Sequence, residues 1–94
     1  MVNDRYDQAW FVYIAQCKDS SLYVGIALNV ERRIHEHNNT QRCRYTRFRK
    51  PVTLLYKEPC KDYSSARKRE KEIKRFSRNK KLSLISKDLS PVIS

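Results

Sequence analysis

The sequence predicts an α/β domain of the α+β type, in which a small three-stranded antiparallel sheet is flanked by helices in the order ββαβαα. Two short apolar runs joined by a polar turn indicate a hairpin, and a third run between prolines indicates another strand. Three other stretches repeat apolar residues at helical spacing. Because 94 residues suffice for a single core, we expect one domain at 10–89, a flexible segment at 1–9 and a tail at 90–94.

The three strands differ in their expected place in the sheet. Trp10–Cys17 is rich in β-branched, aromatic and small residues and is apolar on both faces, which predicts the central strand. The polar Lys18–Ser21 turn leads to a second strand at Leu22–Ala27. A third strand at Val52–Tyr56 is expected to end before Pro59 and to lie at a sheet edge, because proline donates no ladder hydrogen bond.

Three helices are expected from their caps and apolar spacing. Asn29 is a suitable N-cap for a short amphipathic helix. Ser64 or Ser65 can cap a second helix that runs to about Phe76, with an apolar inner face and a basic outer one. A third helix is expected near Asn79–Leu89, where leucine and isoleucine recur at helical spacing.

The net charge favours a polyanionic partner. Lysine and arginine number 21 against 10 acidic residues, which gives +11 with histidine neutral. This charge selects a class of partner and excludes no chemistry. The stretch Asn38–Lys50 lacks an apolar period and is expected to be a basic loop in which arginines alternate with aromatic rings, as suits phosphate contact and base stacking. The residues expected to bind nucleic acid are Arg42, Arg44, Tyr45, Arg47, Arg49, Lys50 and, on the second helix, Lys74.

Neither membrane insertion nor a disulfide framework is expected. Charged residues near the start are followed by no long apolar run, so we expect neither a signal peptide nor a membrane span. We therefore expect the protein to be cytoplasmic. The cysteines are odd in number and form no CxxC pair, which argues against disulfides and a zinc site. We expect free thiols at Cys17, Cys43 and Cys60, the first and last at strand ends.

Polar residues stand on helix faces that should be apolar. Arg33 and His37 share the inner face of the first helix. They are either a snorkelling arginine and a hydrogen-bonded helix-end histidine, or functional groups. Glu70 lies between Ala66 and Ile73 in the apolar stripe of the second helix. A carboxylate there is either a structural ion-pair member or a metal ligand.

Two tyrosines and a glycine mark the predicted hairpin. Tyr13 and Tyr23 fall on paired strands and could be ordinary sheet aromatics. Gly25 is the only glycine in the chain and lies inside a strand, where glycine usually marks a bulge or the close approach of another backbone. The glycine favours a special arrangement around the tyrosines.

Together these positions resemble the signature of the GIY-YIG nucleases. Val12-Tyr13, Tyr23-Val24-Gly25 and the Asn29–His37 segment follow one another with the spacing of that family. By this resemblance, the two motif tyrosines, the helix arginine, the histidine one turn later and the metal-binding glutamate are Tyr13, Tyr23, Arg33, His37 and Glu70.

The resemblance covers about residues 10–86 and points to the small, single-domain bacterial branch. Tyr45–Arg47, Pro51–Val52 and Arg69–Lys74 are similar to segments of that branch. Phe11 replaces the first motif glycine, Phe48 stands where the branch often has glycine, and Ser20 occupies a turn position that often prefers glycine. None of these departures touches the five matched residues.

The resemblance implies a metal-dependent endonuclease that hydrolyses phosphodiester bonds in nucleic acid, and DNA is favoured over RNA as its substrate. Glu70 would hold one Mg²⁺ or Mn²⁺, and Arg33 would stabilise charge on the phosphate. Tyr13, assisted by Tyr23 or His37, would orient or deprotonate the attacking water. A free tyrosine titrates near pH ~10, so this role needs a cationic neighbour. The alternatives are a nucleic-acid-binding protein that keeps the scaffold without turnover, and a basic module for an acidic protein or ribosomal RNA.

Overall fold

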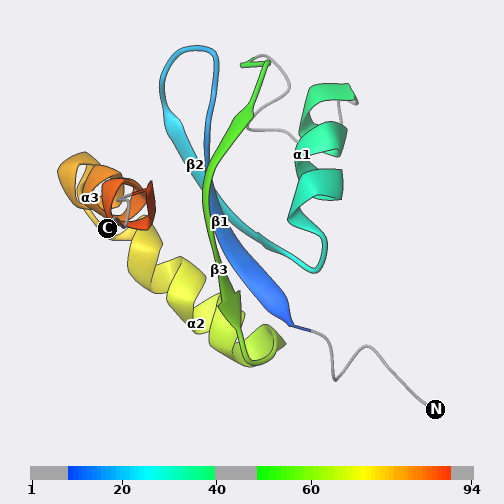
Figure 1. Cartoon of the computed structure of the whole chain (residues 1–94), viewed down its shortest axis with the longest axis vertical. Helices are drawn as coiled ribbons and strands as arrows, with labels where there is room; N and C mark the ends of the chain where they lie inside the picture. Colours follow the sequence, from blue (N-terminus) through cyan, green and yellow to red (C-terminus); the bar gives the residue numbers. More distant parts are fainter. Residues whose placement is uncertain (1–8, 40–48, 90–94) are drawn as a thin grey trace.

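A computed structural model of the chain describes residues 9–39 and 49–89. A three-stranded antiparallel sheet lies between one helix on one face and two helices on the other (Figure 1). This arrangement confirms the predicted α+β class and the order ββαβαα. The elements are β1 (Trp10–Gln16), β2 (Leu22–Ala27), α1 (Val30–Asn39), β3 (Thr53–Cys60), α2 (Tyr63–Lys74) and α3 (Arg78–Leu89).

The sheet has the order β2-β1-β3, so the first strand is central, as predicted. The turn between β1 and β2 is closed by Asp19, whose Oδ1 accepts hydrogen bonds from the Ser21 backbone N–H at 3.0 Å and from the Ser21 hydroxyl at 2.6 Å. Ser20 has a φ of 72°, the left-handed region in which glycine is favoured. Serine therefore takes the conformation that the absent glycine would have adopted freely.

The predicted end of the third strand was wrong. β3 does not stop at Tyr56 but continues through Pro59, which lies opposite Phe11, to Cys60. Because β3 is an edge strand, the missing proline N–H costs no ladder bond on its outer side. The edge position itself is confirmed.

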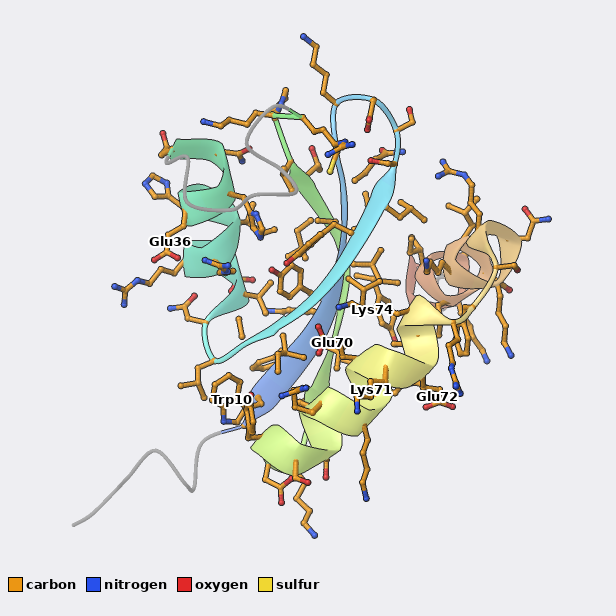
Figure 2. The ribbon with its side chains drawn as sticks, turned by 180° about the vertical axis from the view of Figure 1, so that it is seen from behind. Trp10, Glu36, Glu70, Lys71, Glu72 and Lys74 are labelled. Atoms are coloured by element: carbon orange, nitrogen blue, oxygen red, sulfur yellow. The ribbon has the colours of Figure 1, made fainter. Side chains whose placement is uncertain are left out.

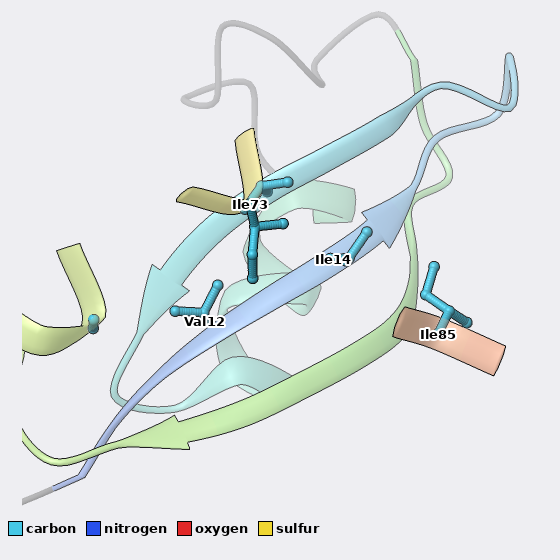
Figure 3. Close-up of a cluster of buried hydrophobic side chains, with 6 residues drawn as sticks. Val12, Ile14, Ile73 and Ile85 are labelled. Atoms are coloured by element: carbon cyan, nitrogen blue, oxygen red, sulfur yellow. The ribbon is translucent and has the colours of Figure 1, made fainter. Parts of the chain in front are cut away.

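Strict alternation along β1 divides the core into two layers. Val12 and Ile14 are fully buried against Ile73 of α2 and Ile85 of α3 (Figure 3). The residues between them point to the opposite face, where α1 packs. The sheet thus separates an α1 layer from an α2/α3 layer.

The first helix is longer than predicted. The Asn29 side chain caps it by accepting a hydrogen bond from the Arg32 backbone N–H at 2.9 Å, as expected. The helix then includes Asn38 and Asn39, the first two residues of the predicted basic loop. Asn38 exchanges two hydrogen bonds with the backbone of Val52, at 2.6 and 3.0 Å, and so ties the last turn to the start of β3.

The other two helices differ from expectation at their starts. Asp62, and neither Ser64 nor Ser65, caps α2, since its Oδ1 accepts from the Ser65 backbone N–H at 2.8 Å. The helix ends at Lys74, two residues before Phe76.

The third helix begins at Arg78, one residue early, after Ser77 has capped it. Ile85 is buried there, but Leu82 is exposed, and Leu84 packs against the core. Cys17 and Cys60 carry free thiols at strand ends, as predicted, while Cys43 falls outside the described residues.

Candidate functional site

Tyr13 and His37 form a buried hydrogen-bonded pair in the α1 layer. Tyr13 comes from the central strand and His37 from α1, and their Oη and Nε2 atoms are 3.0 Å apart. Tyr13 is 1% exposed and His37 is fully buried. Each group gives the other a polar partner where an unpaired one would cost free energy. This bond explains how histidine is accommodated on the inner face of the helix.

Tyr23 lies against both members of this pair. Its ring centroid is 5.1 Å from that of His37 and 6.1 Å from that of Tyr13. Strand pairing accounts for this, because Tyr23 lies opposite Ala15, two residues along β1 from Tyr13, on the same face of the sheet. We call Tyr13, Tyr23 and His37 the aromatic triad. Tyr23 is its partly exposed member.

Gly25 makes room for the Tyr13 ring. The two residues are directly paired between β1 and β2. A Cβ atom added at Gly25 would lie 2.7 Å from the Tyr13 hydroxyl oxygen and 2.8 Å from Cζ. The glycine thus marks the close approach of a side chain, whereas the sequence suggested a bulge or a backbone. The register irregularity lies instead between Ile14 and Ala15, on the β3 side of β1.

Gly25→Ala should therefore lower the free energy of unfolding by about 1–3 kcal/mol, because the buried Tyr13 ring must move and its bond to His37 must break. Chemical denaturation measures the loss. In a Tyr13→Leu background, which lacks the outer ring atoms, the same substitution should cost clearly less. An equal cost in both backgrounds would show that the ring is not the obstacle.

Arg33 places a positive charge at the border of the aromatic triad. Its Nη1 donates to Glu36 Oε1 at 3.0 Å, and the side chain is partly exposed. Burial lowers the pKa of His37 below its ordinary value of 6.5, the nearby Arg33 lowers it further, and Glu36 opposes the shift. His37 is therefore neutral at pH 7.

This shift predicts a pH dependence of stability. His37 takes up a proton near pH 6.5 in the unfolded chain but only at lower pH in the folded protein. The contribution of neutral His37 to the free energy of unfolding is therefore fully present above pH 6.5, and it is lost as the pH falls toward the folded pKa. The free energy of unfolding of His37→Gln should fall less over this range. His35→Gln is the control, because His35 is exposed on the same helix. Parallel pH profiles of the wild type and His37→Gln would contradict the prediction.

Glu70 lies on the other side of the sheet from the aromatic triad. Its helix, α2, packs across β1 and the edge strand β2, and Figure 2 shows Glu70 between α2 and the sheet. Its side chain is 15% exposed, and its carboxylate oxygens lie 3.1 Å from Lys74 Nζ and 3.7 Å from Arg67 Nε. The structure thus brings Tyr13, Tyr23, Arg33 and His37 together in one layer, and Glu70 stands in the other.

Comparison with known proteins identifies the family. Residues 9–83 match the family described as the GIY-YIG catalytic domain. This chain belongs to the GIY-YIG family. Its relatives include a UPF0213 protein of Desulfotalea psychrophila, 54% identical over 78 residues that cover 82% of this chain and 71% of that protein. A UPF0213 protein of Staphylococcus saprophyticus is 55% identical over 76 residues, 81% and 93% of the two chains.

Solved structures of similar proteins share the GIY-YIG fold. The solution NMR structure of the UPF0213 protein BH0048 from Bacillus halodurans has 37% identity and a TM-score of 0.57, and 88% of each chain is covered. That of EF2693 from E. faecalis has 30% identity and a TM-score of 0.58 over 100% of this chain and 98% of the other. The chain thus belongs with small bacterial members of a nuclease-type family whose enzymes generally use divalent metals.

Only some of the residues predicted to bind nucleic acid fall within the part of the chain that the structure describes. Lys74 lies on α2 beside Glu70. Arg49 is paired with Asp19 of the β1–β2 turn, with Nε and Oδ2 3.2 Å apart, and Lys50 follows it, half-buried. The other four predicted residues, Arg42, Arg44, Tyr45 and Arg47, fall at 40–48, outside the described residues.

The sequence patterns did not single out Arg67, or the side-chain contacts that hold α2 against β3. Arg67 precedes Glu70 by one helical turn, a spacing that could have identified it. Arg69 Nε donates to Glu58 Oε2 at 2.7 Å, and Glu58 also accepts a hydrogen bond from Tyr56. Burial and this bond raise the pKa of Tyr56 to about 12. The network fixes the turn of α2 that carries Glu70 against β3.

Two further features bear on the kind of site. None of the helices in the described part of the chain is long and apolar enough to span a membrane. Within residues 9–39 and 49–89, no three His, Cys, Asp or Glu side chains lie close enough to share a metal ion.

Proposed function

We propose that this protein is a divalent-metal-dependent endonuclease that hydrolyses phosphodiester bonds in nucleic acid, with DNA the expected substrate ahead of RNA. The observation that carries this proposal is the buried Tyr13–His37 hydrogen bond with Tyr23 and Arg33 beside it, in a chain that belongs to the GIY-YIG family. An ordinary sheet aromatic needs neither a buried imidazole partner nor a glycine opposite its ring. The pair therefore favours a chemical role over a packing role.

The aromatic triad would position the attacking water. Since Tyr13 and His37 are buried and Tyr23 is partly exposed, we assign contact with the water to Tyr23. Tyr13 and His37 lie behind it and restrict its ring through the ring contacts already described. Because the pKa of His37 is lowered, its imidazole stays neutral beside the Tyr13 hydroxyl, and the hydrogen bond between the two groups holds both side chains in place.

Arg33 and Glu70 lie in different layers, so they would reach the phosphate from opposite sides of the edge strand β2. Arg33 is half-buried at the border of the triad, where its guanidinium would stabilise charge on the non-bridging oxygens. Glu70 fits a single Mg²⁺ or Mn²⁺: it offers hard oxygen ligands, it retains access to solvent, and its present partners Lys74 and Arg67 are half-exposed and able to turn away. The ion, when bound, supplies an electrophile for the phosphate and the leaving oxygen.

A nicking assay tests this function. Purified protein is incubated with supercoiled plasmid and Mg²⁺ or Mn²⁺, with and without a chelator. Metal-dependent conversion to the open circle supports the proposal, and binding without any cleavage favours the rival, a nucleic-acid-binding protein without turnover. The observation on the side of the rival is that Glu70 already has two cationic partners.

Binding to nucleic acid should weaken steeply with salt. A net charge of +11 implies that phosphate contacts release counterions from the nucleic acid, so log affinity should fall linearly with log salt. Fluorescence anisotropy with a labelled duplex at several salt concentrations gives the slope, and two duplexes of unrelated sequence should share it. A flat plot would exclude a charge-driven interface.

A further inference from the structure

Four residues form one continuous stripe along α2. Tyr63, Arg67, Glu70 and Lys74 follow one another at intervals of four, three and four residues, so their side chains lie on the same side of the helix. Neighbouring members are in contact, since Arg67 Nη1 donates to the Tyr63 hydroxyl at 3.1 Å and both Arg67 and Lys74 pair with Glu70. We call this set the α2 stripe. It joins an aromatic ring to the proposed metal ligand.

Tyr63 is an exposed ring held in a fixed orientation. It is 47% exposed, and among the described residues Tyr63 and Leu82 are the large apolar side chains left in solvent. Trp10 contacts Tyr63 edge to face, with centroids 4.9 Å apart, and Arg67 holds its hydroxyl. A ring that is already oriented loses little conformational entropy when another planar group stacks on it. Simple core packing would have buried it.

The chemistry around this ring suits an unpaired nucleotide. The half-exposed Arg67 and Lys74 flank Glu70 on either side, so the stripe offers positive charge beside its aromatic end. Figure 2 shows Trp10, Glu70 and Lys74 in succession along this side of the molecule. Stacking on aromatic rings together with cationic backbone contacts is how proteins hold single strands. A paired base is unavailable for such stacking unless it is flipped out.

We propose that the α2 stripe is a track for a single-stranded segment of the substrate, with a base stacked on Tyr63 beside Trp10 and phosphates contacted by Arg67 and Lys74. This inference rests on the proposed function only in placing the cleaved bond at Glu70. Seven residues of helix separate Tyr63 from Glu70, about 10 Å. That length equals about three stacked nucleotides. The substrate class is therefore nucleic acid with an unpaired segment next to the cleaved bond, such as a flap or an overhang.

The test measures binding in a chelator, so that cleavage plays no part. The probes are a DNA hairpin with a blunt end and the same hairpin with a short adenine overhang at either the 5′ or the 3′ end. The wild type should bind one of the overhang hairpins more tightly than the blunt hairpin. Trp10, the only tryptophan in the chain, should lose fluorescence on binding that overhang and much less on binding the blunt hairpin.

Tyr63 variants separate stacking from other effects. Tyr63→Leu should weaken binding to the overhang hairpin about tenfold and leave blunt binding unchanged. Tyr63→Phe keeps the ring and loses only the hydroxyl contact with Arg67, so it should retain most of the overhang affinity. Leu82→Ala is the matched control, because it removes an exposed apolar side chain outside the stripe. Thermal melting shows that each variant is folded.

Two outcomes would overturn the track: wild-type affinity of Tyr63→Leu for every overhang, or an equal loss on blunt and overhang hairpins. The proposed function fails separately, through the nicking assay. An overhang preference that depends on Tyr63 in a protein that never cuts would support the track and refute the nuclease.

Discussion

Glu70→Gln should reduce metal-dependent cleavage about 100-fold or more while the protein stays folded and bound to nucleic acid. The amide keeps the shape of the side chain but loses the charge that would hold Mg²⁺ or Mn²⁺, and with it the electrophile at the leaving oxygen. Binding without metal should be unchanged or slightly tighter, because one negative charge is lost from a protein of net charge +11. Nicking rates and metal-free affinities of the variant and the wild type measure both effects.

A structural role for Glu70 predicts a different result. Its two partners, Arg67 and Lys74, are half-exposed and can turn to water, so losing these ion pairs should lower the melting temperature little. Glu72→Gln is the control, since Glu72 lies two positions after Glu70 but pairs with Arg69, and this variant should cut normally. A Glu70→Gln protein that cuts at the wild-type rate, or that unfolds, would remove Glu70 from the proposed site.

Local patterns were enough to predict the aromatic part of the site. Alternation along the first strand predicts which side chains of β1 share a face, and strand pairing then brings Tyr13 and Tyr23 to the same face of the sheet. Helical spacing places His37 on the inner side of α1. Both periodicities follow from local backbone geometry, so they can be predicted without knowing which distant segments will come into contact.

What the sequence did not predict depends on contacts between distant segments. Whether β3 continues past Tyr56 is decided by its edge position, which frees Pro59 from donating to a neighbour. The extra turn of α1 depends on hydrogen bonds between Asn38 and Val52, 14 residues apart. The separation of Glu70 from the triad by the sheet is likewise invisible in a pattern that only orders motifs along the chain.

Arg33→Ala should lower the cleavage rate about 100-fold, the usual effect of removing one preorganised donor to a developing oxyanion. Arg33 also acts on the triad electrostatically, because its charge lowers the pKa of His37. Its loss should therefore raise the pKa of His37, which a pH titration of the imidazole NMR signals can follow. Affinity for nucleic acid should fall only slightly, by the amount expected for the loss of one positive charge.

Arg32→Ala is the matched control for Arg33→Ala. Arg32 is adjacent in sequence, carries the same charge and also pairs with Glu36, with Nε and Oε2 3.6 Å apart, but its side chain is far more exposed than that of Arg33. Removing Arg32 makes the same change in net charge and also removes a contact with Glu36, while the border of the triad stays intact. Cleavage should be nearly unaffected in Arg32→Ala. Equal losses in the two variants would mean that Arg33 contributes through bulk charge, and its assignment to the phosphate would then fall.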